Sequence, residues 1–323
     1  MLRAAGAVVL LALALLAGTT WAGTGRTLAV AGSIQAIAAE DGVVAVHVHP
    51  SKGCDYVLTW KPSASLTSRI VHCSSSDQSL QDLAFAGGVP IWWDYSSGNH
   101  VYCDDVYAGK KALHLCDGSE GDTYYEFSGD RSIAAISDYS VCEDDCLDAN
   151  GNTLPNGNYG VEVKQLVNGK VVPLLKPVNF RVFLGAGNNR VATIEPKATL
   201  TVWDATGKKL WSLPGITSVY GGWIDGNTVA LHETRSLHVY TAAGAGVVRP
   251  LPKGADVDNV AGGYVCYVGG SSIRLLRLSD GRDRKVLLPS NVEWFDFTSA
   301  GLFYSTGRSM NFMPLADVLR KLR

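Results

Sequence analysis

The segment from Cys142 to Tyr159 holds the densest group of side chains that can bind a ligand. It carries several carboxylates followed by two asparagine amides. Carboxylate and amide oxygens are hard donors, which calcium prefers as ligands. Calcium is therefore the candidate cofactor, and the predicted metal ligands are Asp145, Asp148, Asn150 and Asn152.

The same segment has other interpretations. Its stretch from Asp148 to Asn152 resembles the alternating start of a calcium loop, but Thr153 and Tyr159 stand where that motif has glycine and a terminal glutamate. Direct recognition of a partner is the second interpretation, because long loops often carry function. Its candidate residues are Glu143, Asp144 and Asp145. A solvated hairpin pinned by a disulfide is the third.

Two shorter groups also combine suitable side chains. Trp92, Trp93 and Asp94 bring aromatic faces beside a carboxylate, an arrangement that can stack on a sugar or a peptide. Packing in the protein interior explains the same tryptophans. His47 and His49 alternate along one strand face and suit a metal if a third ligand is near, although packed polar residues explain them as well.

Catalytic residues are not identifiable. The chain has neither a Gly-x-Ser-x-Gly nucleophile motif nor a His-Glu-x-x-His zinc motif. A carboxylate pair for glycoside cleavage depends on a separation that sequence does not give. Its members would come from Asp94, Asp104, Asp105, Asp138 and Glu293.

A repeat positions all of these groups. Two apolar residues three apart, a Gly or Asn turn and a short apolar strand recur seven times, about 35 to 55 residues apart. One copy runs from Ile34 to Val48 and the next from Leu80 to Trp93. Each repeat contains four short strand-like segments, which predicts an all-β, single seven-bladed β-propeller.

The seventh repeat is one strand short. The N-terminal strand Leu28–Val30 resembles the outer strand that precedes each new repeat, so we expect it to complete the last blade and close the circle. Six blades with a partial hairpin are the runner-up, because Val219–Pro250 fits the repeat least well.

One hairpin carries a recognisable pattern. The segment Leu200–Trp211, with Trp203-Asp204 before its turn, resembles the outer hairpin of WD-repeat and quinoprotein-like propellers. One other Trp-Asp pair, Trp93-Asp94, is present, and the Gly-His dipeptide that opens a WD repeat is absent. The resemblance implies the propeller shape and transfers no functional residue.

The first 22 residues have the pattern of a signal peptide. Arg3 precedes the apolar run Ala4–Ala17, and small residues at Thr20 and Ala22 fit cleavage after Ala22. A retained anchor is the alternative, but the run is shorter than the ~20 residues of a spanning helix. Residues 23–323 then form the propeller domain, secreted or periplasmic, with no membrane span. The absence of Asn-x-Ser/Thr sequons favours a bacterial source.

The seven cysteines fit export to an oxidising compartment. Positions 54 and 73 are symmetric about one predicted hairpin turn, and positions 103 and 116 about another, so each pair faces across two strands. Three residues separate Cys142 from Cys146. The predicted disulfides are Cys54–Cys73, Cys103–Cys116 and Cys142–Cys146, with Cys266 a buried free thiol.

These features favour a secreted, non-enzymatic binding propeller whose ligand, a protein or a carbohydrate, lies on its rim. The alternative is an extracellular propeller hydrolase or lyase acting on carbohydrate. Convergent carboxylates and aromatics on the innermost strands would favour the enzyme. The net charge of −2 gives no drive toward nucleic acid. We expect a monomer.

Overall fold

The computed structural model describes most of the chain after the predicted signal peptide. The described residues are 26–64, 66–73, 78–96, 106–113, 115, 123–142, 156–216, 219, 221–233 and 235–322. Side chains are not described at residues 66, 78, 79, 81, 94–96, 123, 141 and 142.

The described strands form seven antiparallel sheets of four strands each. The innermost strands are β2 (Ser33–Glu40), β6 (Gln78–Ala86), β10 (Thr123–Asp130), β14 (Val182–Gly187), β18 (Gly221–Asp225), β22 (Asp256–Ala261) and β26 (Val292–Thr298). The second strands are β3 (Val43–His49), β7 (Val89–Ser96), β11 (Ile133–Cys142), β15 (Arg190–Glu195), β19 (Thr228–Glu233), β23 (Tyr264–Gly269) and β27 (Gly301–Thr306).

The outer half of each sheet follows the same order. The third strands are β4 (Asp55–Lys61), β8 (Val106–Ala108), β12 (Gly157–Val167), β16 (Thr199–Asp204), β20 (Ser236–Thr241), β24 (Ser272–Arg277) and β28 (Ser309–Pro314). The outermost strands are β5 (Leu66–His72), β9 (Lys111–Ala112), β13 (Lys170–Val178), β17 (Lys209–Pro214), β21 (Gly244–Pro250), β25 (Asp283–Lys285) and β1 (Arg26–Ala29). Two short helices complete the described elements, η1 (Pro62–Ala64) and α1 (Leu315–Arg320).

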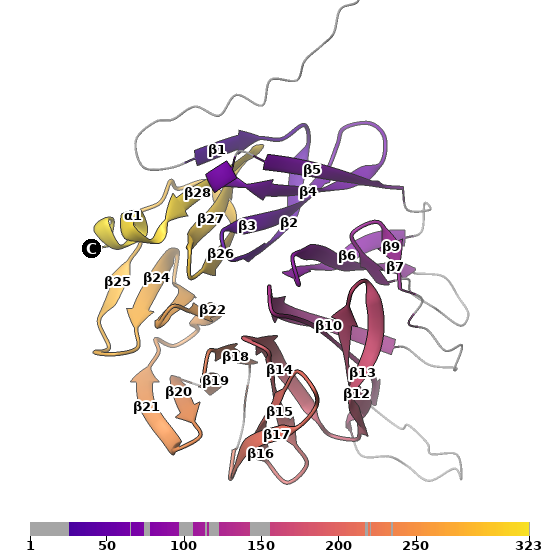
Figure 1. The fold of residues 1–323 in the computed structure, drawn as a ribbon. Coiled ribbons are helices and arrows are strands. Elements are labelled where there is room, and N and C mark those ends of the chain that lie inside the picture. Colours follow the sequence, from indigo (N-terminus) through magenta and orange to yellow (C-terminus); the bar gives the residue numbers. More distant parts are fainter. Residues whose placement is uncertain are drawn as a thin grey trace, which may run out of the picture.

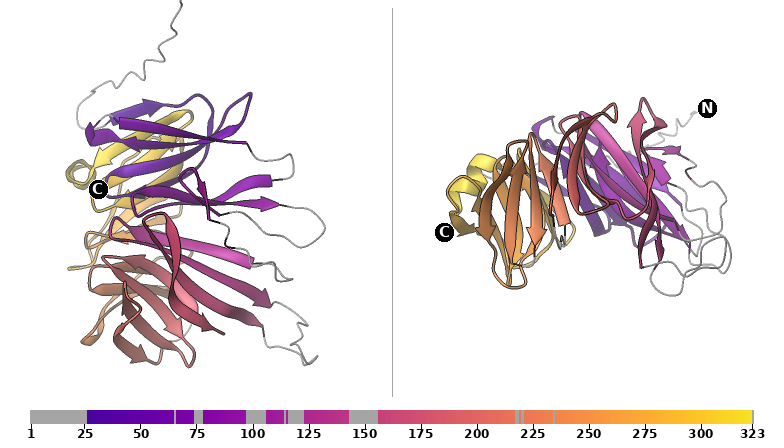
Figure 2. Two further views of the ribbon diagram at one scale, coloured as in Figure 1. Left: turned by 45° about the vertical axis from the view of Figure 1, so that its right-hand side comes forward. Right: turned by 90° about the horizontal axis from the view of Figure 1, so that it is seen from below.

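The sheets stand as seven blades around a central channel (Figure 1). Strands run across the thickness of the propeller between two faces, as its edge view shows (Figure 2). We call one face the turn face: it holds the turns from first to second strand, such as Glu40–Val43 and Asp130–Ile133. The other is the connection face, where β11 ends at Cys142, β12 begins at Gly157 and each innermost strand starts.

Pairing of the two ends of the chain closes the propeller. β1 pairs with β28, with Thr27 opposite Asn311 and Leu28 opposite Met310. This confirms both the seven blades and the closing N-terminal strand, and the six-bladed alternative is wrong because β18 to β21 form a complete fifth blade. Closure covers the edge of β28 that would otherwise expose unpaired backbone groups.

Apolar side chains pack mainly between neighbouring blades. Blades 7 and 1 share a cluster that includes Trp60, Phe303 and Met310, and the aromatic rings of Trp60 and Phe303 meet edge to face at 6.3 Å. Six further clusters follow around the circle. Strand alternation produces this arrangement, because each sheet must bury both of its faces.

The Cys54–Cys73 disulfide is confirmed. Asp55 lies opposite His72 in the β4–β5 hairpin, and the register continues to the two cysteines, whose Cα atoms are 4.7 Å apart. Cys266 is a buried free thiol, as predicted. Cys103, Cys116 and Cys146 lie outside the described residues and the Cys142 side chain is not described, so both other disulfides stay predictions.

No helix in the described part of the chain is long and apolar enough to span a membrane.

The closing strand should carry a large share of the stability. Leu28 is 3% exposed and packs with Phe303 and Met310, so Leu28→Ala should lower the free energy of unfolding by about 2–5 kcal/mol. Urea unfolding of the protein spanning residues 23–323 measures this. Val71→Ala is the matched control, because Val71 is 57% exposed. Equal urea midpoints for the two variants would contradict the role of closure.

Candidate functional site

An aromatic pocket opens between blades 2 and 3, where β6 and β7 face β10 and β11. Its volume is about 460 Å³. Five aromatic side chains and two carboxylates supply most of its wall. The lining residues, which define the aromatic pocket, are Asp82, Leu83, Ala84, Trp93, Tyr124, Tyr125, Glu126, Phe127 and Tyr139.

Hydrogen bonds fix the two carboxylates of the aromatic pocket. The indole Nε1 of Trp93 donates to Oδ2 of Asp82 at 2.7 Å. The hydroxyl of Tyr139 donates to Oε1 of Glu126 at 3.0 Å. The aromatic rings of Tyr124 and Tyr139 stack with centroids 6.0 Å apart, and Tyr124 is 39% exposed. The pocket therefore combines an accessible aromatic wall with carboxylates held in place.

Backbone geometry aims Asp82 into the aromatic pocket. The β6–β7 register shifts between Gln81 and Ala84, so one extra residue forms a bulge. Asp82 lies in this bulge with φ +45°, a left-handed value that is uncommon for residues other than glycine. Glu126 needs no bulge and pairs opposite Ser137 in regular register.

The aromatic pocket favours the protonated forms of Glu126 and Tyr139. Crowding by the surrounding side chains raises the pKa of Glu126, although the residue reaches the surface, and the charge of Asp82 raises it further. The hydrogen bond from Tyr139 acts in the opposite direction. Burial and the neighbouring carboxylates of Glu126 and Asp82 raise the pKa of Tyr139. Burial and neighbouring acidic groups therefore both oppose ionisation of Glu126 and Tyr139.

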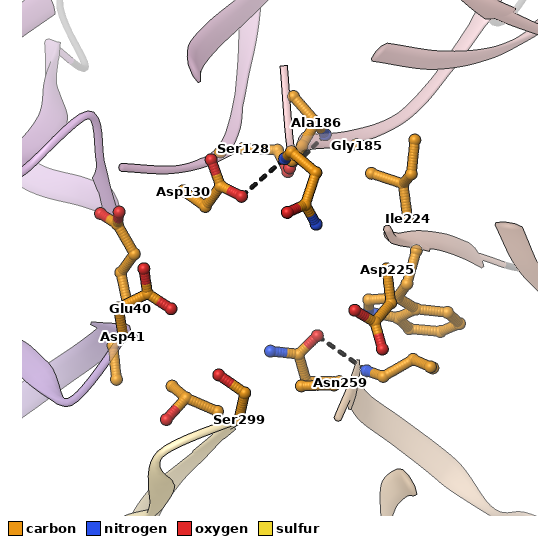
Figure 3. Close-up of a pocket in the computed structure, with 18 of the residues that line it drawn as sticks. Glu40, Asp41, Ser128, Asp130, Gly185, Ala186, Ile224, Asp225, Asn259 and Ser299 are labelled. Carbon is orange, nitrogen blue, oxygen red and sulfur yellow. Dashed lines mark hydrogen bonds between the residues drawn. The ribbon is translucent and has the colours of Figure 1, made fainter. Parts of the chain in front are cut away.

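A second cavity, the channel pocket, occupies the central channel near the turn face and has a volume of about 320 Å³ (Figure 3). Acidic and amide side chains lie around its open centre. Its polar lining residues include Glu40, Asp41, Asp130, Asn188, Asp225, Asn259 and Ser299.

Three carboxylates of the channel pocket hold neighbouring blades together. Glu40, Asp130 and Asp225 are the last residues of β2, β10 and β18, on alternate blades. Each accepts a backbone N–H from the first turn of the next blade. The donors are Gly88 at 3.4 Å, Asn188 at 2.6 Å and Gly263 at 3.4 Å, respectively. Burial raises the pKa of Glu40 to about 7.

A pair of aspartates links the last blades to the first. Asp296 Oδ2 accepts the N–H of Ala39 at 2.5 Å, from blade 7 to blade 1. Asp258 Oδ2 accepts the N–H of Phe297 at 3.3 Å, from blade 6 to blade 7. Burial raises the pKa of Asp296 to about 7, and burial together with the charge of Asp296 holds the pKa of Asp258 well above its usual value.

The histidines singled out in the sequence share one carboxylate. Nε2 of His47 and Nδ1 of His49 each lie 2.7 Å from an oxygen of Asp55. The packed-polar interpretation fits the buried His47, whereas the side chain of His49 is exposed. No group of three or more His, Cys, Asp or Glu among the described residues has the arrangement of a metal site.

The predicted binding residues fall on two parts of the chain. Trp92 is fully buried and stacks on Tyr107 with centroids 5.5 Å apart, and Trp93 is buried with its indole bonded to Asp82. The side chain of Asp94 is not described. The insertion residues Glu143, Asp144, Asp145, Asp148, Asn150 and Asn152 lie outside the described residues. Their binding roles stay predictions.

Sequence reasoning did not single out Asp82, Glu126 or Tyr139. A signal was present, because Asp82 and Glu126 each precede the second apolar residue of the repeat motif and lie four residues before the end of their strands. Equivalent positions on adjacent blades lie at the same level of neighbouring innermost strands. Two acidic residues at such positions therefore predict neighbouring carboxylates.

Comparison with known proteins supports the fold. No protein-family model and no curated protein matches the chain. The structure is similar to the β-propeller domain of the Trilobed protease from Pyrococcus furiosus, with a TM-score of 0.55 and 10% identity, covering 91% of this chain and 98% of that one. That domain has an open velcro topology. Here β1 pairs with β28 instead.

Two further solved structures are much longer than this chain. A prolyl endopeptidase has a TM-score of 0.51 and 12% identity, covering 80% of this chain and 42% of that chain. PorZ, a surface component of the type-IX secretion system of Porphyromonas gingivalis, has a TM-score of 0.49 and 12% identity, covering 91% and 38%. The chain thus spans about two fifths of each. The likeness to the prolyl endopeptidase is one of fold alone.

Acidification should stabilise the folded protein. Because the pKa values of Asp258, Asp296 and Glu40 are raised, the folded state binds more protons than the unfolded state, and the free energy of unfolding falls as pH rises toward about 7. Each extra bound proton contributes about 1.4 kcal/mol per pH unit. Melting temperatures from about pH 5 to about pH 8 should therefore decrease.

Substitution of Asp258 isolates this effect. Asp258→Asn keeps an oxygen for the N–H of Phe297 and removes a titrating group, so the decrease should become shallower. Asp280→Asn is the control, because Arg277 lowers the pKa of the exposed Asp280 to about 2, below the range measured. A melting temperature independent of pH in the unsubstituted protein would refute the assignment.

Proposed function

We propose that this chain is an exported, non-enzymatic binding propeller that holds a protein or carbohydrate ligand on its connection face at blades 2 and 3. The aromatic pocket carries this proposal, because it places exposed aromatic surface beside two fixed carboxylates. Aromatic side chains with a few oriented polar groups are the usual lining of a recognition site. The Cys54–Cys73 disulfide supports an oxidising compartment.

The placement of the insertion supports the same face. β11 carries Tyr139 in the aromatic pocket and ends at Cys142 on the connection face, where the acidic stretch from Glu143 to Asp148 follows in sequence. The earlier prediction that this stretch recognises a partner and the position of the pocket point to one side of the propeller. Long connections on one face of a rigid scaffold commonly carry binding.

The channel carboxylates favour binding over hydrolysis. Convergent acidic residues on innermost strands are the feature expected of a carbohydrate hydrolase or lyase. Two buried carboxylates on innermost strands, Asp258 and Asp296, each accept a backbone N–H from the next blade. Glu40, Asp130 and Asp225 do the same at the turn face. Hydrogen bonding between blades explains why these carboxylates are present, which supports the binding function.

A screen with matched variants tests the proposed function. The immobilised protein, residues 23–323, is probed with a glycan array and with proteins from culture medium, and bound species are identified. Tyr124→Ala should reduce capture of the ligand by about tenfold or more, because it removes exposed aromatic surface from the pocket. Leu210→Ala, 44% exposed on β17, is the control and should retain capture. Equal ligand capture by the Tyr124→Ala variant and the unsubstituted protein, or turnover of the ligand, would overturn the proposal.

Calcium binding by Asp145, Asp148, Asn150 and Asn152 is part of this proposal. Excess calcium should raise the melting temperature of the oxidised protein, because a ligand that binds the folded state stabilises it by mass action. A chelator should reverse the rise, and Asp145→Ala with Asp148→Ala should abolish it. Melting curves that do not change with calcium would refute calcium binding by these residues.

A further inference from the structure

The two carboxylates of the aromatic pocket have no cationic partner among the described residues. Two partly buried carboxylates elsewhere have cationic partners: Asp138 lies 2.5 Å from Nζ of Lys164, and Glu195 lies 2.7 Å from Nε of Arg181. Asp82 and Glu126 form no ion pair with any described residue and accept only from Trp93 and Tyr139 among those residues. A cation that enters between these two carboxylates would form the ion pairs that the described residues do not provide.

The two carboxylates offer acceptor oxygens to a ligand, beside the hydroxyl of the exposed Tyr124. The indole N–H of Trp93 and the hydroxyl of Tyr139 are already donated to the two carboxylates. The second oxygen of each carboxylate remains as an acceptor. A sugar presents hydroxyls that both donate and accept, whereas a guanidinium only donates, through several N–H groups in one plane.

The aromatic wall suits the same ligand. The rings of Tyr124 and Tyr139 stack with an interplanar angle of 22°, and Trp93 meets Tyr125 edge to face at 5.8 Å. Ring faces attract cations, and the flat guanidinium both stacks on such faces and forms paired hydrogen bonds to carboxylates. The aromatic wall and the two carboxylates therefore favour one chemical group.

The backbone conformation of Asp82 independently indicates a functional role for this side chain. Register shifts also occur in the innermost strands of blades 1, 4, 6 and 7, but the left-handed φ of Asp82 is a strained value for a residue other than glycine. The bulge turns Asp82 toward the Trp93 indole and the pocket, on the wall opposite Glu126. Strain kept at such a position is commonly associated with function.

We propose that the aromatic pocket binds the guanidinium of an arginine side chain presented by a partner protein. Asp82 and Glu126 receive its N–H groups from opposite walls, and Tyr124 covers its face. This inference rests on the proposed binding function of the connection face and names the partner group that it recognises.

Two tripeptides that differ in one charge test the inference. Acetyl-Gly-Arg-Gly-amide and its citrulline counterpart, which keeps the shape and loses the charge, are titrated against the protein spanning residues 23–323 by ligand-observed NMR. The arginine peptide should bind about tenfold more tightly or better. Asp82→Asn with Glu126→Gln should remove this difference.

The control removes the same charges elsewhere. Asp256→Asn with Glu293→Gln takes two exposed carboxylates from the innermost strands of blades 6 and 7 and should preserve arginine selectivity. Melting curves verify that both double variants fold. Equal affinity for arginine and citrulline peptides, or equal loss in both double variants, would overturn the inference. If either result is found while ligand capture in the screen still depends on Tyr124, the binding function stands and only the arginine assignment fails.

Discussion

Closure of the propeller is the constraint on which the rest of the structure depends. Every blade buries its two faces against neighbours, so the first and last blades must also meet. The closure is made twice, at the outer edge by β1 on β28 and at the channel by the N–H of Ala39 on the carboxylate of Asp296. Burial of Asp296 at this second contact raises its pKa to about 7, so the seam is coupled to pH.

The carboxylates of the channel pocket and those of the aromatic pocket have different hydrogen-bond partners. At the turn face, Glu40, Asp130 and Asp225 bridge successive blades through backbone N–H groups, so their charges are bound into the framework. Between blades 2 and 3, Asp82 and Glu126 bond to side chains of the same pocket and bridge no backbone. This contrast is the physical reason for assigning binding to the aromatic pocket.

Much of the fold could be predicted because its determinants are local. The repeat spacing gave the number of blades, the short last repeat indicated the closing strand, and hairpin symmetry identified Cys54–Cys73. The aromatic pocket could not be predicted with the same ease. It depends on the left-handed backbone of Asp82 and on contact between strands of different blades, and neither appears in the period of the pattern. The shared repeat position of Asp82 and Glu126 was the available clue.

A crystal structure of the protein with the arginine tripeptide tests the central claim most directly. The account predicts a guanidinium in the aromatic pocket, between the carboxylates of Asp82 and Glu126 and against the ring of Tyr124. The channel pocket offers a competing acidic surface at Asp41 and Asp225. A guanidinium bound there, with the aromatic pocket empty, would contradict the assignment of ligand binding to the connection face.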